Sequence, residues 1–478
     1  MSTLQSPKRY ALIPPDEGKP VAGRVPISIV GMINRTSFGF TQAEHHLALT
    51  MGHGPYLNRQ LNPETIDDSE LEARLAGAEF PTLSMTPEQL GTQNTTDVRN
   101  QLIRARLVRA VFSKRQLYER MVDFWTDHFN IWLFEDGIPG NQKTWDDANV
   151  VRPHALGSFP AMLSASAHSP AMLDYLNNNT NTASGPNQNY ARELMELHTM
   201  GVDGGYTQED VIQVARCFTG WTYWGGSTNP STNRYRFRYN SGTHDNGQKI
   251  VLGNIIPAGG GQQDGETVLQ ILANHPSTAN YIAKKLLMHF WGENPSAGHI
   301  ASVAAIYTRT GGDIRAMMRA VLNTPFNQPW EAKLKRPFHH MASALRALSA
   351  TVTSPGNLQN QMTASGHLPF NWQTPDGYPD TLSVWSGLLL PRWNFGASLM
   401  NNNFSGVSVD TTALLAGLPT PLTAVSVVGR INHLMFGGLM PSDEQIRLTS
   451  YLLPNPPTTS RIREAFGLAI GSPAFQWA

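Results

Sequence analysis

One helical pattern sets the main constraint on how this chain folds. Residues 95–132 read TTDVRNQLIRARLVRAVFSKRQLYERMVDFWTDHFNIW, and their apolar side chains recur every three or four positions. This period matches an amphipathic helix, and the run is long enough for roughly ten turns. A single break is expected near Ser113, and Thr96 followed by Asp97 predicts an N-terminal cap. A fold built mainly from α-helices follows.

The same pattern recurs to the end of the chain. It predicts helices over 158–177 with a break at Pro170, 189–201, 206–220, 265–274, 277–291, 298–323, 329–351, 381–401, 420–437, 442–452 and 459–470. In the helix at 206–220, Thr207 and Asp210 have the spacing of a capping box and Gly220 is a helix stop. These segments leave little room for sheet.

One segment departs from the helical pattern. Residues 221–262 are rich in Gly, Asn, Ser and aromatic residues, and RYRFRY (234–239) alternates as a short strand does. The first 28 residues are aperiodic and carry prolines, which indicates an extended arm. We therefore expect one large multi-helix domain over 29–478, with a small irregular β-containing insertion at about 221–262.

Composition excludes several functional classes. The 36 basic and 36 acidic residues give zero net charge, which does not favour a nucleic-acid partner. The single cysteine, Cys217, excludes an intramolecular disulfide and a cysteine-type zinc site, and its apolar context predicts a buried thiol. No apolar run reaches the roughly 18 residues that a transmembrane helix needs.

The sequence gives partial information on location. The N-terminal residues lack the apolar core of a signal peptide, so no intact signal is expected in this chain. Charged residues make up only 15% of the chain, which also has one cysteine and 11 tryptophans, a composition that fits a periplasmic or secreted protein. An extracytoplasmic location is the expectation, and a cytoplasmic one stays open.

The densest group of reactive side chains lies in NYARELMELHTMG (189–201). On a helix, Asn189, Glu193 and Glu196 fall on one face at i, i+4 and i+7, beside an aliphatic stripe. Two carboxylates one turn apart are able to divide acid and base roles or to share a metal ion. The alternative is an ion-pair network in which Arg192 and other arginines neutralise both glutamates.

A second candidate lies in DFWTDHFNIW (123–132). Its histidine, His128, is surrounded by aromatic and aliphatic side chains at helical spacing, which predicts partial burial. It is interpreted either as an ordinary core group or as a functional imidazole. In the functional reading, Asp127 or Glu193 from a neighbouring helix would orient it.

The insertion supplies a third candidate group. His244, Asp245 and Lys249 lie in THDNGQKIVLG (243–253), where the residues either bind a metal or form a turn of the Asp-Asn-Gly kind. The aromatic residues near these polar motifs, Trp125, Trp221 and Tyr223 among them, are either core groups or platforms that stack on sugar rings.

A family resemblance adds to these patterns. The run NQNYARELMELHTMGVDGGYTQEDVIQVARCFTGW (187–221) closely resembles the signature of a bacterial family called domain of unknown function 1800. Further stretches resemble it from about residue 30 onward: MINRTSFGF (32–40), FWTDHF (124–129), HSPAMLDYLNN (168–178), His244-Asp245 with Lys249, HPSTANYIAKKL (275–286), KRPF (335–338), and Trp385, Arg392 and Asn394. The resemblance implies a mostly helical, often exported protein and supplies no reaction. Gln188 stands where the family usually has glutamate, which keeps hydrogen bonding but removes the charge.

Three functions from different classes fit these residues. The leading hypothesis is a hydrolase of a glycan or other extracellular polymer. Its catalytic candidates are Glu193, Glu196, Asp210, Asp127 and His128, and its substrate-binding candidates are Asn189, Arg192, His198, Trp125, Trp221, Tyr223, His244, Asp245 and Lys249. The second is an enzyme with a divalent metal held by Glu, His and Asp in the helical core. The third is an export-associated binding protein whose glutamates form a buried network with arginines, without catalysis.

Overall fold

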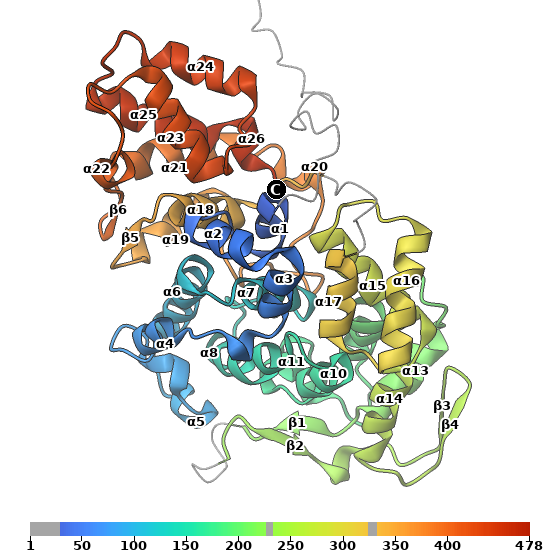
Figure 1. Cartoon of the computed structure of the whole chain (residues 1–478). Helices are drawn as coiled ribbons and strands as arrows, with labels where there is room; N and C mark the ends of the chain where they lie inside the picture. The colour runs from blue at the N-terminus through green and yellow to red at the C-terminus, as the bar shows by residue number, and fades with distance from the viewer. Residues whose placement is uncertain (1–28, 226–232, 324–331) are drawn as a thin grey trace, which may run out of the picture.

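The computed structural model describes residues 29–225, 233–323 and 332–478, and the arm expected at 1–28 lies outside these ranges (Figure 1). Within them the fold is mainly α, as the sequence predicts. The helices of the first half are α1 (Ile29–Thr36), α2 (Gln42–Met51), α3 (His53–Leu61), α4 (Ser69–Leu75), α5 (Pro87–Leu90), α6 (Thr95–Phe112), α7 (Gln116–His128), α8 (Pro139–Asp146), α9 (Arg152–His154), α10 (Phe159–Ala167), α11 (Pro170–Tyr175), α12 (Asn189–Glu193) and α13 (Gln208–Cys217).

The second half continues in the same way. Its helices are α14 (Gln263–Ala273), α15 (Pro276–Phe290), α16 (Ala297–Thr310), α17 (Ile314–Asn323), α18 (Pro337–Ala347), α19 (Gly356–Ala364), α20 (Leu382–Trp385), α21 (Leu389–Met400), α22 (Thr411–Leu414), α23 (Ala424–Phe436), α24 (Ser442–Leu452), α25 (Thr459–Gly471) and α26 (Pro473–Gln476). Among the described residues, no helix is both long and apolar enough to cross a bilayer.

Local sequence signals explain most helix ends. The long pattern at 95–132 divides into α6 and α7 at Ser113, whose hydroxyl donates to Asp68 at 2.6 Å. The cap of α6 is Asn94, one residue before the helix, whose side chain accepts from the backbone N–H groups of Thr96 and Asp97. The expected cap at Thr96 is therefore wrong by two positions.

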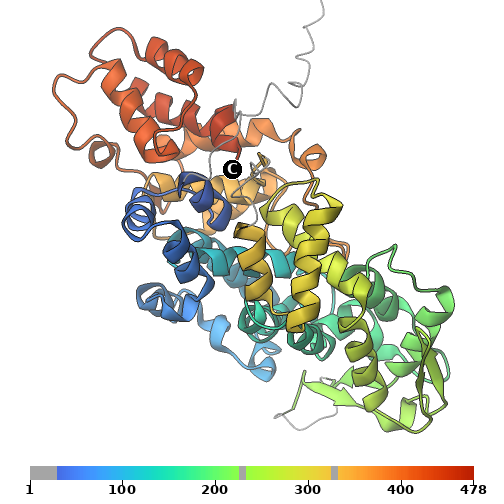
Figure 2. The ribbon, with the colours of Figure 1, turned by 45° about the vertical axis from the view of Figure 1, so that its right-hand side comes forward.

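Two apolar cores hold the helices together. The larger core joins α1, α3, α7, α10 to α12 and α13 to α17, and the second joins α6, α18, α21 and α23 to α25. Figures 1 and 2 show the corresponding arrangement, with the C-terminal helices at one end and α10 to α16 at the other. Cys217 is buried in the larger core, as expected, and burial raises the pKa of its thiol to about 12.

Helices α21 and α25 pack closely against each other. Their backbones meet at two glycines, because a Cβ added at Gly396 would lie 2.7 Å from the Gly467 carbonyl oxygen. Small residues at such a crossing allow the two helix axes to approach. Side chains from both helices then complete the second core.

The β structure is small. In the expected insertion, β1 (Trp221–Tyr223) pairs antiparallel with β2 (Phe237–Tyr239), and β3 (Lys249–Val251) with β4 (Asn254–Ile256). The strand predicted from RYRFRY is thus β2. A third antiparallel pair, β5 (Thr351–Val352) with β6 (Val407–Ser408), lies outside the insertion, in the C-terminal half.

The helix at the centre of the signature is not regular. After α12 it continues as a π-helical segment over Leu194–Thr199, in which the backbone N–H of Met200 donates to the carbonyl of Met195 at 2.8 Å. The Thr199 hydroxyl also donates to the carbonyl five residues earlier, on Leu194, at 2.6 Å. Such wide turns are often found at functional sites. The turn changes the direction of every side chain that follows Glu193, so the ideal i, i+4, i+7 face is distorted.

Candidate functional site

A cavity of about 260 Å³ lies where α7 ends. Its walls come from the last turn of α7, from α15, from the loop before α20 and from the segment before α18. Its lining residues are Phe124, Asp127, His128, Tyr281, Lys284, Lys285, Met288, Arg336, Asp376, Tyr378, Pro379 and Asp380. Apolar walls with a few converging charged groups are the usual form of a small-molecule site.

A glycine lets the loop before α20 close onto α7. Gly377 has φ +73°, and a Cβ there would lie 2.1 Å from the Asp127 carbonyl oxygen. A side chain at this position would therefore both strain the backbone and clash with α7. The contact places Asp376, Tyr378 and Asp380 against the end of that helix.

Asp127 is one of two largely buried carboxylates in the cavity wall. Its carboxylate accepts a short hydrogen bond from Arg336, whose guanidinium also contacts Asp380 at 3.2 Å. Burial raises the pKa of Asp127 to about 6, although the Arg336 guanidinium opposes the rise. Asp127 therefore exchanges its proton close to neutral pH.

Lys285 brings an unpaired amine to the same cavity. It is half-buried and, within the described part of the chain, makes no hydrogen bond or ion pair; its Nζ lies 5.6 Å from the centroid of the Tyr281 ring. Burial lowers its pKa to about 8, although the carboxylates of Asp127 and Asp380 oppose the change. A fraction of this amine is neutral at physiological pH, so it is able to accept a proton or to act as a nucleophile.

The expected orientation of His128 by Asp127 or Glu193 is wrong. The His128 Nε2–H instead donates to the backbone carbonyl of His198 at 3.1 Å. The Asp127 carboxylate accepts a hydrogen bond from Arg336. His128 Nδ1 and His198 Nε2 have no hydrogen-bond partner among the described residues. Burial lowers the pKa of both imidazoles, that of His198 to about 3, so both are neutral near pH 7.

The two signature glutamates differ in their surroundings. Arg192 pairs with Glu196 at 3.3 Å and also donates to Gln208, so part of the expected arginine network exists. Glu193 is half-buried, and its pKa is raised by burial, then by the charge of Glu196 and, to a lesser degree, by that of Asp376. Glu193 is not one of the residues that line the cavity. Asn189, exposed at the start of α12, contacts Asn177 at 3.3 Å.

Four predicted residues have structural roles instead. The Asp210 carboxylate caps α13 through Thr207 and also accepts from the Leu252 backbone N–H at 2.8 Å. Trp125 and Trp221 are 0% exposed, so the core encloses both rings and neither is a platform for sugar stacking. Tyr223 is half-buried, and its hydroxyl donates to Asp174.

The insertion residues form their own buried group. His244 and Lys249 both contact the buried Asp264 carboxylate of α14, at 3.2 and 2.5 Å, and Arg216 of α13 pairs with Asp245 at 2.7 Å. These contacts fasten the insertion to two helices. Within the described ranges, no three His, Cys, Asp or Glu side chains gather as metal ligands.

Sequence reasoning missed Lys285 and Asp376. Lys285 lies within the helix predicted over 277–291, and its position beside Ile282 and Leu286 was a usable signal, since a lysine near an apolar stripe is partly buried. Asp376 lies in the turn-rich TPDGYPD, which looks like an ordinary loop. Their local partners, Tyr281 for Lys285 and Trp372 and Thr374 for Asp376, do not show that the two residues share a cavity.

The amine of Lys285 is accessible to a direct test. Competitive acetylation with acetic anhydride at pH 8 compares Lys285 with the exposed Lys114. We expect the Lys285 amine to react at least about threefold faster, because a pKa near 8 leaves about half of the Lys285 amine groups neutral at this pH. Peptide mass spectrometry would give both rates. A pH profile for Lys285 that matches the profile for Lys114 would contradict the lowered pKa.

A family model described as "Protein of unknown function (DUF1800)" matches residues 31–477, nearly the whole chain. No curated protein and no solved structure matches it.

Proposed function

The chain belongs to the family of proteins of unknown function DUF1800, and from the geometry of its cavity we propose that it is a hydrolase of glycans that works by acid–base catalysis. One observation carries this proposal. Asp127 and Asp376 line one cavity, and burial raises the pKa of Asp127 to about 6, close to neutrality. Groups that exchange protons near the working pH are the most effective general acids and bases.

The roles follow from the surroundings of each group. Asp127, protonated in part near pH 6, would donate a proton to the leaving oxygen of a glycosidic bond. Asp376, which accepts hydrogen bonds from the Trp372 indole at 2.9 Å and from the Thr374 hydroxyl, would be the second carboxylate. It would take a proton from the water molecule that attacks the anomeric carbon as the bond to the leaving oxygen breaks. Two carboxyl groups with distinct environments are what glycoside hydrolysis requires. The proposed catalytic carboxylates are therefore Asp127 and Asp376 of the cavity, in place of Glu193 and Glu196, which the sequence suggested.

The remaining groups would bind the substrate. The Tyr281 ring lines the cavity and would pack against the apolar face of a sugar, and Lys285 and His128 would contact its hydroxyl groups. Glu193 does not line the cavity and would take no part in the chemical step. We also propose an extracytoplasmic location, which rests on the composition and on the family resemblance.

Substitution of the two cavity carboxylates tests the proposal. In a screen of polysaccharides and aryl glycosides, we expect the wild-type chain to cleave at least one, and Asp127→Asn and Asp376→Asn each to lower kcat about 100-fold. Glu193→Gln should lower kcat/KM by about tenfold or less, because the residue does not line the cavity. The exposed Glu70 of α4 supplies the control, Glu70→Gln, with unchanged rates.

Melting temperatures would separate chemistry from folding. Asp376 is held only by nearby loop residues, so its variant should unfold close to the wild-type temperature. Failure of the wild-type chain to cleave any glycan, or full activity of both carboxylate variants, would reject a hydrolase at this cavity.

A second candidate rests on the ion pairs. Buried contacts such as Arg152 to Glu119 at 2.7 Å, together with Arg192 to Glu196, favour a non-enzymatic binding protein in which the signature maintains the fold. In that case Glu196→Gln would lower stability and no glycan would be cleaved.

A further inference from the structure

The wall of the cavity carries charged side chains of both signs. They are Asp127, Lys284, Lys285, Arg336, Asp376 and Asp380. Equal numbers of positive and negative groups do not make the wall neutral at every point, because ion pairs join only some of these side chains. The charges that stay unpaired determine what kind of sugar the cavity accepts.

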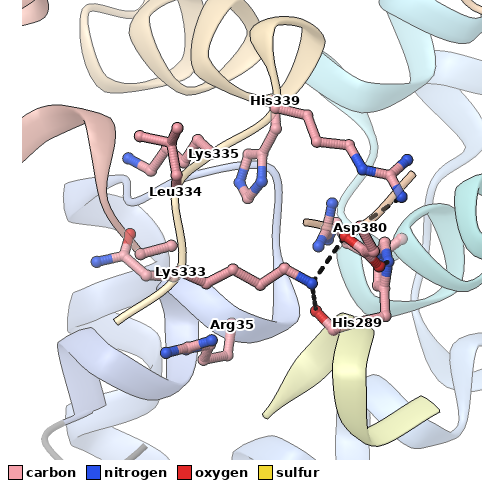
Figure 3. Close-up of a pocket in the computed structure, with 11 residues that line it drawn as sticks. Arg35, His289, Lys333, Leu334, Lys335, His339 and Asp380 are labelled. Atoms are coloured by element: carbon pink, nitrogen blue, oxygen red, sulfur yellow. Dashed lines mark hydrogen bonds and ion pairs between the residues drawn. The ribbon is translucent and has the colours of Figure 1, made fainter. Parts of the chain in front are cut away.

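Two of the carboxylates are balanced by cations of the protein itself. Arg336 donates a short hydrogen bond to Asp127 and contacts Asp380 at 3.2 Å. Asp380 is also paired at 2.8 Å with Lys333, which does not line the cavity. Figure 3 shows the Lys333 side chain extending toward Asp380 and His289. Asp127 and Asp380 are therefore balanced without a cation from α15.

The two lysines that α15 contributes have no such partner. Lys284 is exposed and Lys285 is half-buried, and within the described ranges neither amine makes a hydrogen bond or an ion pair. The charge of Asp376, the remaining carboxylate, acts on Lys285 without forming an ion pair with it. One positive charge of the wall is therefore left over, and a second is left over when Asp127 holds the proton that it would donate as the general acid.

A sugar that enters the cavity displaces water from Lys285. A neutral sugar would offer hydroxyl groups only, and the desolvated ammonium would stay without an anion, which is costly. A sugar carboxylate instead accepts charge-assisted hydrogen bonds, which are roughly twice as strong as bonds between neutral groups. A uronic acid carries its carboxylate in place of the hydroxymethyl group, so it hardly enlarges the ring. A sulfate ester would add a bulky group within a cavity of about 260 Å³.

We propose that the cavity selects glycans that contain uronic acid, with the sugar carboxylate bound by the ammonium groups of Lys285 and Lys284. This selection rests on the hydrolase proposed above, because it names the substrate class of the same site. Lys285 would contact the carboxylate from within the cavity, and the exposed Lys284 would do so from the solvent side. The Tyr281 ring, whose centroid lies 5.6 Å from the Lys285 amine, would pack against the same sugar.

Binding of matched ligands to the full wild-type chain tests the selection. The ligands are sulfur-linked disaccharides of glucuronate, galacturonate and mannuronate, which resist hydrolysis, and each is compared by calorimetry at pH 7 with its neutral methyl ester. We expect at least one acid to bind about tenfold more tightly than its ester, because only the acid balances the charge of the lysines. Equal affinities of acid and ester for all three sugars, or tighter binding of a sulfated galactose disaccharide, would overturn the proposal.

Variants of the lysines assign the contact. Lys285→Met should weaken binding of the acid about tenfold, to the level of the ester, and leave the affinity for the ester within about twofold. Lys285→Arg should keep the preference for the acid, because it keeps the positive charge. The control is Lys114→Met at the exposed Lys114, which lies outside the cavity and should affect neither affinity. A full preference for the acid in both Lys285→Met and Lys284→Met would also overturn the proposal.

Proton uptake provides a readout that a purely structural role of Lys285 would not change. At pH 8 about half of the Lys285 amines are neutral, because burial lowers their pKa to about 8, so binding of the sugar carboxylate should take up about 0.5 proton. The other titratable groups around this amine keep their charge state at pH 8. They are Asp127, His128, His198, Tyr281, Lys284, Arg336, Asp376, Tyr378 and Asp380. Calorimetry in buffers of different ionisation enthalpy would measure the uptake. Its absence in the wild type, or its persistence in Lys285→Arg, would reject the contact with Lys285.

Cleavage assays separate the selection from the hydrolase on which it rests. Cleavage of neutral glycans without activity on uronate polymers would reject the selection and leave the hydrolase standing. Lysine-dependent binding of a uronate disaccharide, without cleavage of any glycan, would reject the hydrolase and keep the binding site. Cleavage of a uronate polymer that Lys285→Met weakens and Lys285→Arg retains would support both.

Discussion

Replacing Asp380 by asparagine is expected to lower the free energy of unfolding by about 3–5 kcal/mol, the usual cost of removing one partner from a buried ion group. Burial alone would raise the pKa of this carboxyl, but Arg336, His289 and Lys333 hold the pKa well below its usual range. The neutral amide would leave the charges of Arg336 and Lys333 without this carboxylate. The hydrogen bond from His289 would lose its charged acceptor as well.

Urea unfolding followed by circular dichroism at pH 7 would measure this loss. The matched control is Asp443→Asn on α24, because Asp443 is 59% exposed and pairs only with Arg447 one turn away. That change should stay within about 0.5 kcal/mol of the wild type. A loss below about 1 kcal/mol for Asp380→Asn would show that the surrounding cations do not depend on this carboxylate.

The chain is also expected to lose stability steeply in mild acid, because its buried histidines are neutral. Burial lowers the pKa of His198 and of His340 from the ordinary value of 6.5 to about 3, and those of His128, His339 and His367 shift in the same direction. In the unfolded chain these histidines therefore bind protons near pH 6.5. In the folded chain His198 and His340 do so only near pH 3. Stability is full above pH 6.5 and falls as the pH drops through this window.

The size of the acid effect follows from the same values. At pH 5, His198 and His340 should each cost about 2 kcal/mol relative to pH 7. Asp127 acts in the opposite direction, because its pKa is raised to about 6 in the folded chain; binding a proton there returns about 1.4 kcal/mol. A net loss of about 3 kcal/mol or more is the expected result.

Urea unfolding at pH 7, 6 and 5 would show the trend. His340→Gln should reduce by about one the number of protons that unfolding takes up, and so lower the slope of the unfolding free energy against pH. The control is His46→Asn at the exposed His46, which should leave this slope unchanged. Equal stability of the wild type at pH 5 and pH 7 would mean that these imidazoles find solvent or partners in the folded chain.

The parts of the fold that sequence predicted correctly depend on local signals. The break at Pro170, the capping box of Thr207 and Asp210 and the strand in RYRFRY each follow from residues within a few positions of one another. The cap at Asn94 was missed because two polar residues after it offered an equally good pattern.

The parts that sequence missed depend on distant partners. Arg336 lies 209 residues after Asp127, so no periodicity could predict that it would occupy that carboxylate and leave His128 to a backbone carbonyl. The burial of Trp221 likewise depends on a later helix, because a Cβ at Gly265 would lie 2.5 Å from the indole. The sequence predicted that Lys285 lies on a helix, but not that its side chain lines a cavity. The sequence showed the charge pattern of the helix at 189–201. It could not show how far that helix lies from the cavity.

The separation between Asp127 and Arg336 also affects the order of events during synthesis. A ribosome adds about 5–20 residues per second, so Asp127 emerges roughly 10–40 seconds before a partner 209 residues later exists. During that interval the end of α7 carries a carboxylate with no cation to hold it in place. The nascent chain is therefore unable to complete this region early, whatever its local helical propensity, and the cavity is assembled only after most of the polypeptide has been made.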